Sequence, residues 1–147
     1  MIRPMLMLAA AALVACGGPS AAQAPSGLPA LTGRVVDNAD LLSPDQEAFL
    51  ARALEITERR TKHQFVVVTL PSLNGKPIEK VGLELGRGWR IGRKGHDDGV
   101  LLIVAPNERK VRIEVGYGLE KSLTNAEAAA IIERRILPRF RRGAMAA

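Results

Sequence analysis

The chain has 147 residues, a length that suits a single domain. Aromatic residues make up only 3% of it, so the core must be aliphatic, and a single cysteine excludes a framework of disulfide bonds. The formal net charge of +6 and the pI of about 10.1 favour anionic partners, namely nucleic acid, lipid headgroups or acidic proteins.

The first sixteen residues predict an export signal. Arg3 precedes an apolar run, Met5 to Val14, that is shorter than the ~20 residues needed to span a bilayer. Cys16 follows Leu13-Val14-Ala15, which resembles the bacterial lipobox, where the signal is cleaved before the cysteine and the thiol is acylated. We therefore expect residues 1–15 to be a lipoprotein signal peptide and Cys16 to be the lipid anchor. The alternative is a cleavable signal that happens to contain a cysteine.

Residues 16–30 are rich in glycine, proline and small polar side chains, which predicts a flexible tether between the lipid and a domain at 31–147. We expect the exported chain at the bacterial cell membrane or the outer membrane, facing the periplasm or the exterior. Export excludes nucleic acid as a partner. The basic charge is therefore assigned to the membrane surface or to an envelope or inner-membrane protein complex.

The first part of the domain predicts helices and strands in alternation. A capping box at Ser43 begins a helix that runs to about Thr61. Continuous apolar runs at 64–70 and 99–105 predict strands buried on both faces. A second helix opens at Pro77 between them and is weakened by its glycines. The apolar faces are Phe49, Leu50, Ala53 and Leu54 in the first helix and Ile78, Val81, Leu85 and Trp89 in the second.

The second part predicts a hairpin and a last helix. Residues 110–116 alternate apolar and charged side chains, which is typical of an antiparallel strand with one solvent-exposed face. A capping box at Thr124 begins a helix that Pro138 kinks, and five arginines crowd its C-terminal end. This order of elements predicts a small three-layer α/β/α sandwich with a mixed β-sheet. The residues expected to face inward in the last helix are Ala128, Ile131, Ile132, Ile136 and Phe140.

Four segments resemble the TPM-domain family, in family order: GRVVDNADLLS, QFVVVTLPSLNGKPIE, WRIGRKGHDDGVLLIVA and KVRIEVGYGLEKSLT. Their combination is specific, although each piece alone is weak. The resemblance implies an α/β fold that is often exported or membrane-tethered. It implies either acid phosphatase activity with calcium binding, credited to some members, or an accessory role for membrane complexes. Family domains usually continue into another helix, so this domain is expected to be C-terminally shortened.

Several kinds of site lack their motifs. The glycines form no GxGxxG between a strand and a helix, so a dinucleotide site is not expected. His63 and His96 lie far apart in the sequence and no second cysteine is present, which argues against zinc. The sequence also contains no GxSxG of a serine hydrolase. We assign no catalytic residue on these grounds.

Carboxylates remain as candidate site residues. Asp97 and Asp98 precede a predicted strand, at the end of the sheet where the antiparallel strand leads to Tyr117 and Glu120. The two aspartates either form a turn, since Asp-Gly is a turn signal, or bind Ca²⁺ or Mg²⁺, which take oxygen ligands. The candidate metal ligands are Asp97, Asp98, Asp37, Asp40 and Glu120, and the candidate phosphate or anion ligands are Arg93 and Lys94.

Two functions remain open. The first is a lipid-anchored cell-envelope accessory domain that assists the assembly or maintenance of membrane protein complexes; the lipobox, the tether and the basic last helix indicate it. The second is a weak divalent-metal-dependent acid phosphatase, indicated by the acidic loops and by the family resemblance. A phosphatase needs a metal clamp or an activated nucleophile beside a phosphate-binding group.

Overall fold

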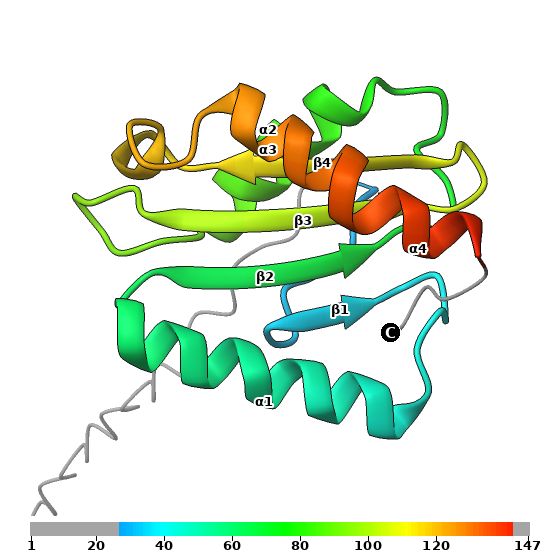
Figure 1. Ribbon diagram of the computed structural model, residues 1–147, viewed down its shortest axis with the longest axis horizontal. Helices are drawn as coiled ribbons and strands as arrows, with labels where there is room; N and C mark the ends of the chain where they lie inside the picture. Colours follow the sequence, from blue (N-terminus) through cyan, green and yellow to red (C-terminus); the bar gives the residue numbers. More distant parts are fainter. Residues whose placement is uncertain (1–26, 143–147) are drawn as a thin grey trace, which may run out of the picture.

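Four strands form one mixed sheet in the computed structural model, which describes residues 27–142. In the order β1-β2-β3-β4, strands β1 (Val35–Asp37), β2 (Gln64–Thr69) and β3 (Gly99–Ala105) run parallel. Strand β4 (Lys110–Val115) pairs antiparallel with β3 (Figure 1). The predicted mixed sheet and hairpin are confirmed. The predicted signal peptide and its lipid anchor lie outside the described residues.

Helices cover both faces of the sheet, as expected for a three-layer sandwich (Figure 1). Helix α2 (Ile78–Trp89) packs on one face. Helix α1 (Pro44–Thr61) and a C-terminal helical segment pack on the other. That segment consists of α3 (Asn125–Ile131), a π-helical turn η2 (Ile132–Ile136) and α4 (Leu137–Arg141). No helix within residues 27–142 is long and apolar enough to cross a bilayer.

The two parallel crossovers have opposite hands. The steps from β1 to β2 and from β2 to β3 go in the same direction across the sheet, yet α1 and α2 lie on opposite faces. One crossover is therefore left-handed, against the strong preference for right-handed connections. Because the C-terminal helical segment lies on the α1 face, α2 is the only helix on its face of the sheet within the described part of the chain.

The hydrophobic core lies on the α2 face. Trp89 is 3% exposed, and its indole Nε1 donates a hydrogen bond of 3.0 Å to the carbonyl oxygen of Pro29. Leu28 and Leu31 also pack against this core, so the packed chain begins before residue 31, where the tether is expected to end. The most deeply buried residues of this face are Val66, Val68, Leu101 and Ile103 of the sheet and Val81 and Leu85 of α2.

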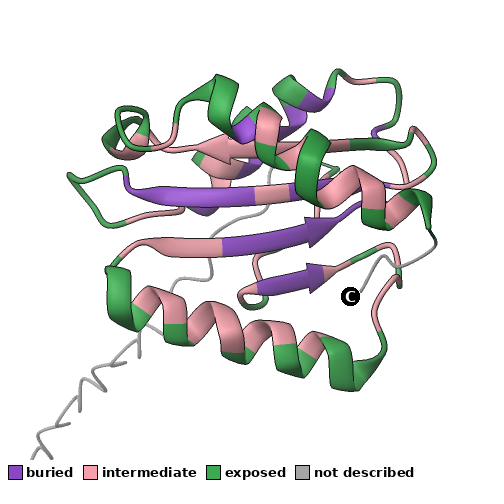
Figure 2. Cartoon of the chain, in the orientation of Figure 1, coloured by how far each residue is buried: buried purple, intermediate pink, exposed green. Residues whose placement is uncertain are grey.

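The α1 face is covered less completely (Figure 2). No residue of α1, η2 or α4 is buried, and Phe49, which is predicted to face the core, is 76% exposed. Leu102 is only half-buried, although its strand β3 lies between two others. The prediction that β3 is buried on both faces is wrong at this residue. The reason is that α1 packs on β1 and β2, whereas the C-terminal segment packs on β4.

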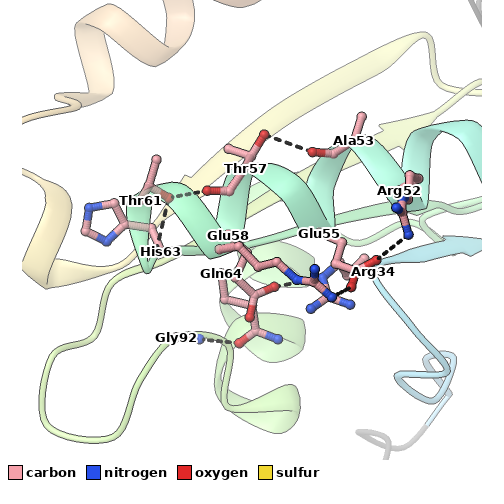
Figure 3. Close-up of polar contacts among 11 residues, drawn as sticks. Arg34, Arg52, Ala53, Glu55, Thr57, Glu58, Thr61, His63, Gln64 and Gly92 are labelled. Atoms are coloured by element: carbon pink, nitrogen blue, oxygen red, sulfur yellow. Dashed lines mark hydrogen bonds and ion pairs between the residues drawn. The ribbon is translucent and has the colours of Figure 1, made fainter.

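Local sequence sets the ends of α1 as predicted. The Ser43 hydroxyl accepts the backbone N–H of Gln46 at 3.3 Å, and the Gln46 side chain accepts the N–H of Ser43 at 2.8 Å. Lys62 ends the helix in a left-handed conformation with φ 65°. Arg34 donates to Glu58 at 2.7 Å, which ties α1 to the residue before β1 (Figure 3).

One glycine of α2, Gly82, permits close packing, whereas Gly86 faces open space. A Cβ atom at Gly82 would lie 2.9 Å from Glu114 Oε2 and 3.1 Å from Ile103 Cδ1. Helix α2 therefore approaches β4 on the side that the sequence predicts to be solvent-exposed. Arg112 and Glu114 on that side are half-buried and form an ion pair of 2.7 Å. The predicted wet face of β4 is wrong because α2 covers it.

The last helix departs from the regular α-helical pattern directly before Pro138. The N–H of Leu137 bonds to the carbonyl of Ile132, five residues back, and proline itself has no N–H to donate. The helix is therefore irregular before Pro138, as a π-helical turn, and the kink expected at Pro138 stays a prediction. Of the residues expected to face inward, Ala128 is buried, whereas Ile131 is 39% exposed.

Replacing Trp89 by alanine tests the core on the α2 face. We expect the Trp89→Ala chain to lose about 3–5 kcal/mol of unfolding free energy, because a large buried aromatic side chain leaves a cavity and its indole hydrogen bond is lost. Urea denaturation followed by circular dichroism measures the loss. Leu83→Ala, on the same helix but 39% exposed, is the control and should change stability far less. Equal effects of the two changes would contradict this assignment.

Candidate functional site

The chain that joins α2 to β3 lies at the end of the sheet where the parallel strands begin. Arg90 ends α2 with φ 52°, and the loop then runs to Asp98, directly before β3. Gln64, the first residue of β2, accepts the backbone N–H of Gly92 through its side-chain oxygen at 2.8 Å (Figure 3). One end of the loop is thereby held to the neighbouring strand.

Asp98 holds the other end of the loop from a buried position. Asp98 is 3% exposed, and its carboxylate accepts three hydrogen bonds from Arg93. The backbone N–H of Arg93 donates to Oδ1 at 2.7 Å, and Nε and one terminal nitrogen lie 2.7 and 2.6 Å from Oδ2. His63 Nδ1, from the residue before β2, lies 3.2 Å from Oδ2. Both carboxylate oxygens are therefore engaged by the protein.

The electrostatics of Asp98 favour the charged carboxylate. Burial raises the pKa of Asp98, but the hydrogen bonds from Arg93 and His63, together with the charge of Arg93, outweigh it. The net result is a pKa well below the usual aspartate range. Asp98 is thus the buried, ionised partner of the half-exposed Arg93, and its role is to fix the loop.

The turn at Asp97 packs against the chain that leaves β4. The carbonyl of Asp97 accepts the N–H of Gly118 at 3.0 Å, and Gly118 belongs to the short 3₁₀ helix η1 (Tyr117–Leu119). A Cβ atom at Gly118 would lie 1.8 Å from the carbonyl oxygen of His96, so only glycine fits this approach. The structure thus places Asp97 beside η1, as the direction of the strands predicts.

A cavity of about 640 Å³ lies between α2 and β4 and reaches this loop. Tyr117 stands at it with 72% of its surface exposed. The rest of the lining consists of glycines, a few aliphatic side chains and charged side chains of both signs, with cations in excess. The cations are Arg87, Arg90, Arg93 and Lys94, and the anions are Asp97, Glu114 and Glu120.

The candidate metal ligands do not converge on one point. Asp97 and Glu120 share the cavity, and Asp98 faces Arg93. Asp37 ends β1 at the opposite end of the sheet, where its carboxylate accepts the N–H of Leu42 at 2.7 Å and the hydroxyl of Thr69. Asp40 follows in the same loop with φ 52°. Within residues 27–142, no three His, Cys, Asp or Glu side chains are grouped so as to hold a metal ion.

The candidate anion ligands differ in their availability. Arg93 is paired with Asp98, whereas Lys94 lines the cavity together with Arg90. Sequence reasoning missed Arg90 and the ion-pair role of His63. His63 lies 35 positions from Asp98, and no spacing rule connects them. The available signal is indirect: His63 precedes β2, Asp98 precedes β3, and parallel neighbours begin at the same edge of a sheet.

Comparisons with known proteins agree with this fold. The TPM domain model, TPM_phosphatase, matches residues 35–147. The N-terminal domain of a protein from P. gingivalis is 39% identical, with a TM-score of 0.72 over 78% of this chain and 73% of that chain. The N-terminal domain of a protein from Corynebacterium glutamicum is 19% identical, with a TM-score of 0.58 over 78% and 72%, and is similar in fold alone. No curated protein matches the chain.

Replacing Asp98 by asparagine tests the ion pair. We expect Asp98→Asn to cost about 3 kcal/mol of unfolding free energy, because Arg93 and His63 lose their charged partner. This value lies at the lower end of the range for broken buried ion pairs, because the Arg93 side chain is half-exposed to solvent. Denaturant unfolding at pH 7 measures it. Asp97→Asn is the matched control. Because the Asp97 side chain is exposed, this change should alter the free energy of unfolding by less than about 0.5 kcal/mol.

The pH dependence of the same pair of variants gives a second readout. The folded pKa of Asp98 lies below its unfolded value of about 3.9, so its stabilisation is fully present above that pH. It is lost as the pH falls toward the lowered pKa. The stability difference between wild type and Asp98→Asn should therefore shrink between about pH 5 and pH 2. A difference that stays constant over this range would show that the charge of Asp98 is irrelevant.

Proposed function

Because the chain belongs to the TPM domain family, whose model matches most of it, we propose that it is a lipid-anchored cell-envelope accessory domain that assists the assembly or maintenance of membrane protein complexes. The observation that carries this proposal is the cavity beside η1, where exposed Tyr117 stands among charged side chains of both signs. Tyrosine and arginine are the residue types enriched at protein interfaces and at their energetic centres. The excess of cations favours an acidic partner surface.

The position of Asp98 supports binding over chemistry. A catalytic carboxyl group must reach the substrate with a pKa suited to proton transfer or attack. Asp98 has a strongly lowered pKa, is turned to Arg93 and His63, and does not line the cavity. Its effect on the cavity is to hold the loop that carries Arg90, Lys94 and Asp97.

A divalent-metal-dependent acid phosphatase is the second candidate. The observation that favours it is the presence of Asp97 and Glu120 in the same cavity as Arg90 and Lys94. The two carboxylates would hold Ca²⁺ or Mg²⁺, and the two cations would bind a phosphate. Glu114 also lines the cavity but is paired with Arg112. Two available carboxylates fit only a weak site, because hard cations take six or more oxygen ligands.

Photo-crosslinking in cells tests the accessory role. We expect benzoylphenylalanine in place of Tyr117 to give a crosslink to an integral membrane protein, identified by mass spectrometry. The same group in place of Glu79, exposed at the first turn of α2 and outside the cavity, is the control. Cys16→Ala should leave an unprocessed precursor that loses the crosslink. If position 117 gives no more product than position 79 in a chain found at the membrane, the proposed role of the cavity is wrong.

Hydrolysis of p-nitrophenyl phosphate separates the two candidates. The accessory role predicts that Ca²⁺ or Mg²⁺ does not stimulate turnover by the purified chain, and that Asp97→Asn with Glu120→Gln has no effect on it. Asp40→Asn with Glu79→Gln makes the same change in charge outside the cavity and is the control. Metal-stimulated turnover that disappears only in the cavity variant, with an unchanged melting temperature, would favour the phosphatase.

A further inference from the structure

A second recess, here called the groove, lies on the face of the sheet opposite α2. It has a volume of about 560 Å³ and runs between α1 and the C-terminal helical segment. Figure 1 shows α1 along one side of this face and α4 along the other. Strands β2 and β3 form the floor through Val67, Leu102 and Val104. The large apolar side chains of the walls are Leu42, Phe49 and Leu50 on the α1 side and Ile136 and Phe140 on the other.

The groove exposes apolar surface at Leu102 and along its walls, whereas the floor residues Val67 and Val104 are 9% and 5% exposed. Leu102 lies at the middle of an inner strand and is half-buried, whereas its neighbours Leu101 and Ile103 on the α2 face are 2% and 0% exposed. Phe49 presents 76% of its surface to solvent at the edge of the groove. Exposed apolar area of this kind is unfavourable in water, and contiguous apolar patches mark interaction sites.

The charges at the rim of the groove differ between its two sides: Asp45 lies on the α1 side, and the other side is basic. Residues 132–142, which comprise η2, α4 and the cap residue Arg142, contain five arginines and a single acid, Glu133. Arg135 and Arg139 line the groove and are exposed. A matching ligand therefore presents apolar groups to the floor and negative charge to the α4 side.

We propose that the groove binds an amphipathic helix of another protein, with aliphatic side chains on its buried face and aspartate or glutamate facing the arginines of η2 and α4. An apolar recess between two helical walls suits this mode, in which side chains at positions i, i+3, i+4 and i+7 anchor the ligand. A second copy of the chain fits less well, because a chain of net charge +6 would meet these arginines with a surface that is itself basic overall. The groove and the Tyr117 cavity lie on opposite faces, so this inference is independent of the proposed function.

A synthetic helix provides the probe. It has about 18 residues, or five turns, with leucines at i, i+3, i+4 and i+7 and glutamates on the remaining face. Two controls are a peptide with lysine for each glutamate and a peptide of the same composition with its leucines distributed around the helix. We expect the glutamate peptide to bind the full chain about tenfold more tightly than either control, by isothermal titration at low salt. NMR shifts should centre on Leu102 and Ile136.

Matched variants of the chain locate the binding surface. Phe49→Ser should weaken binding about tenfold or more, whereas Ile56→Ser, on the same helix but outside the groove, should leave it within about twofold. Arg135→Gln should weaken binding and reduce its salt dependence, whereas Arg60→Gln, exposed on α1, should do neither. The side chains of Phe49 and Arg135 are exposed, so these variants should keep the wild-type fold, which their NMR spectra verify.

Four outcomes would overturn the proposal. The first is equal binding of the glutamate peptide and the distributed-leucine peptide. The second is shifts centred on Tyr117, which would assign the peptide to the cavity. The third is concentration-dependent dimerisation that Phe49→Ser abolishes, which would assign the groove to a second copy. The fourth is that the chain binds phosphatidylglycerol vesicles, that Phe49→Ser abolishes this binding and that the peptide does not compete with it. This result would assign the groove to lipid.

Discussion

The ion pair of Asp98 with Arg93, with His63 as a third partner, is the interaction on which the site depends. It joins the start of β3 to the loop after α2 and to the residue before β2. A buried carboxylate would be costly without these partners, and with them it remains charged. Because this loop is fixed, Asp97 meets Gly118 and the cavity has a defined rim. The acidic pair before β3 is therefore divided between two tasks, since Asp98 supports the loop and Asp97 faces the cavity.

The two faces of the sheet differ in how completely they are packed, and the difference follows from topology. Within residues 27–142, α2 is the one helix on the more completely packed face, and its Gly82 lets it lie close to β4 and Ile103. The opposite face has α1 at one side and the C-terminal segment at the other, with Leu102 half-buried between them. Burial is thus more complete on the α2 face. The other face offers apolar surface for a ligand.

The arrangement separates two potential binding surfaces by chemistry as well as by position. The Tyr117 cavity is lined by charges of both signs, at the end of the sheet where the parallel strands begin. The groove has an apolar floor, with its arginines on the α4 side. Both surfaces favour acidic partners, which agrees with a chain of net charge +6. An accessory domain with two such surfaces is suited to bridge two components of a complex, in line with the proposed function.

The sequence by itself determined the elements and the family. Capping boxes at Ser43 and Thr124, β-branched runs and strict alternation are local signals, so the helices, the strands and the mixed sheet were predictable, as was the core position of Trp89. Tertiary structure alone decided which face each helix covers. Short-range patterns carry no information on the hand of a crossover, so the covering of β4 by α2 and the exposure of Phe49 were not predictable. The same holds for the site: Asp97 and Asp98 were visible as candidates, but only the parallel pairing of β2 with β3 brings His63 to Asp98 and leaves Asp37 at the far end of the sheet.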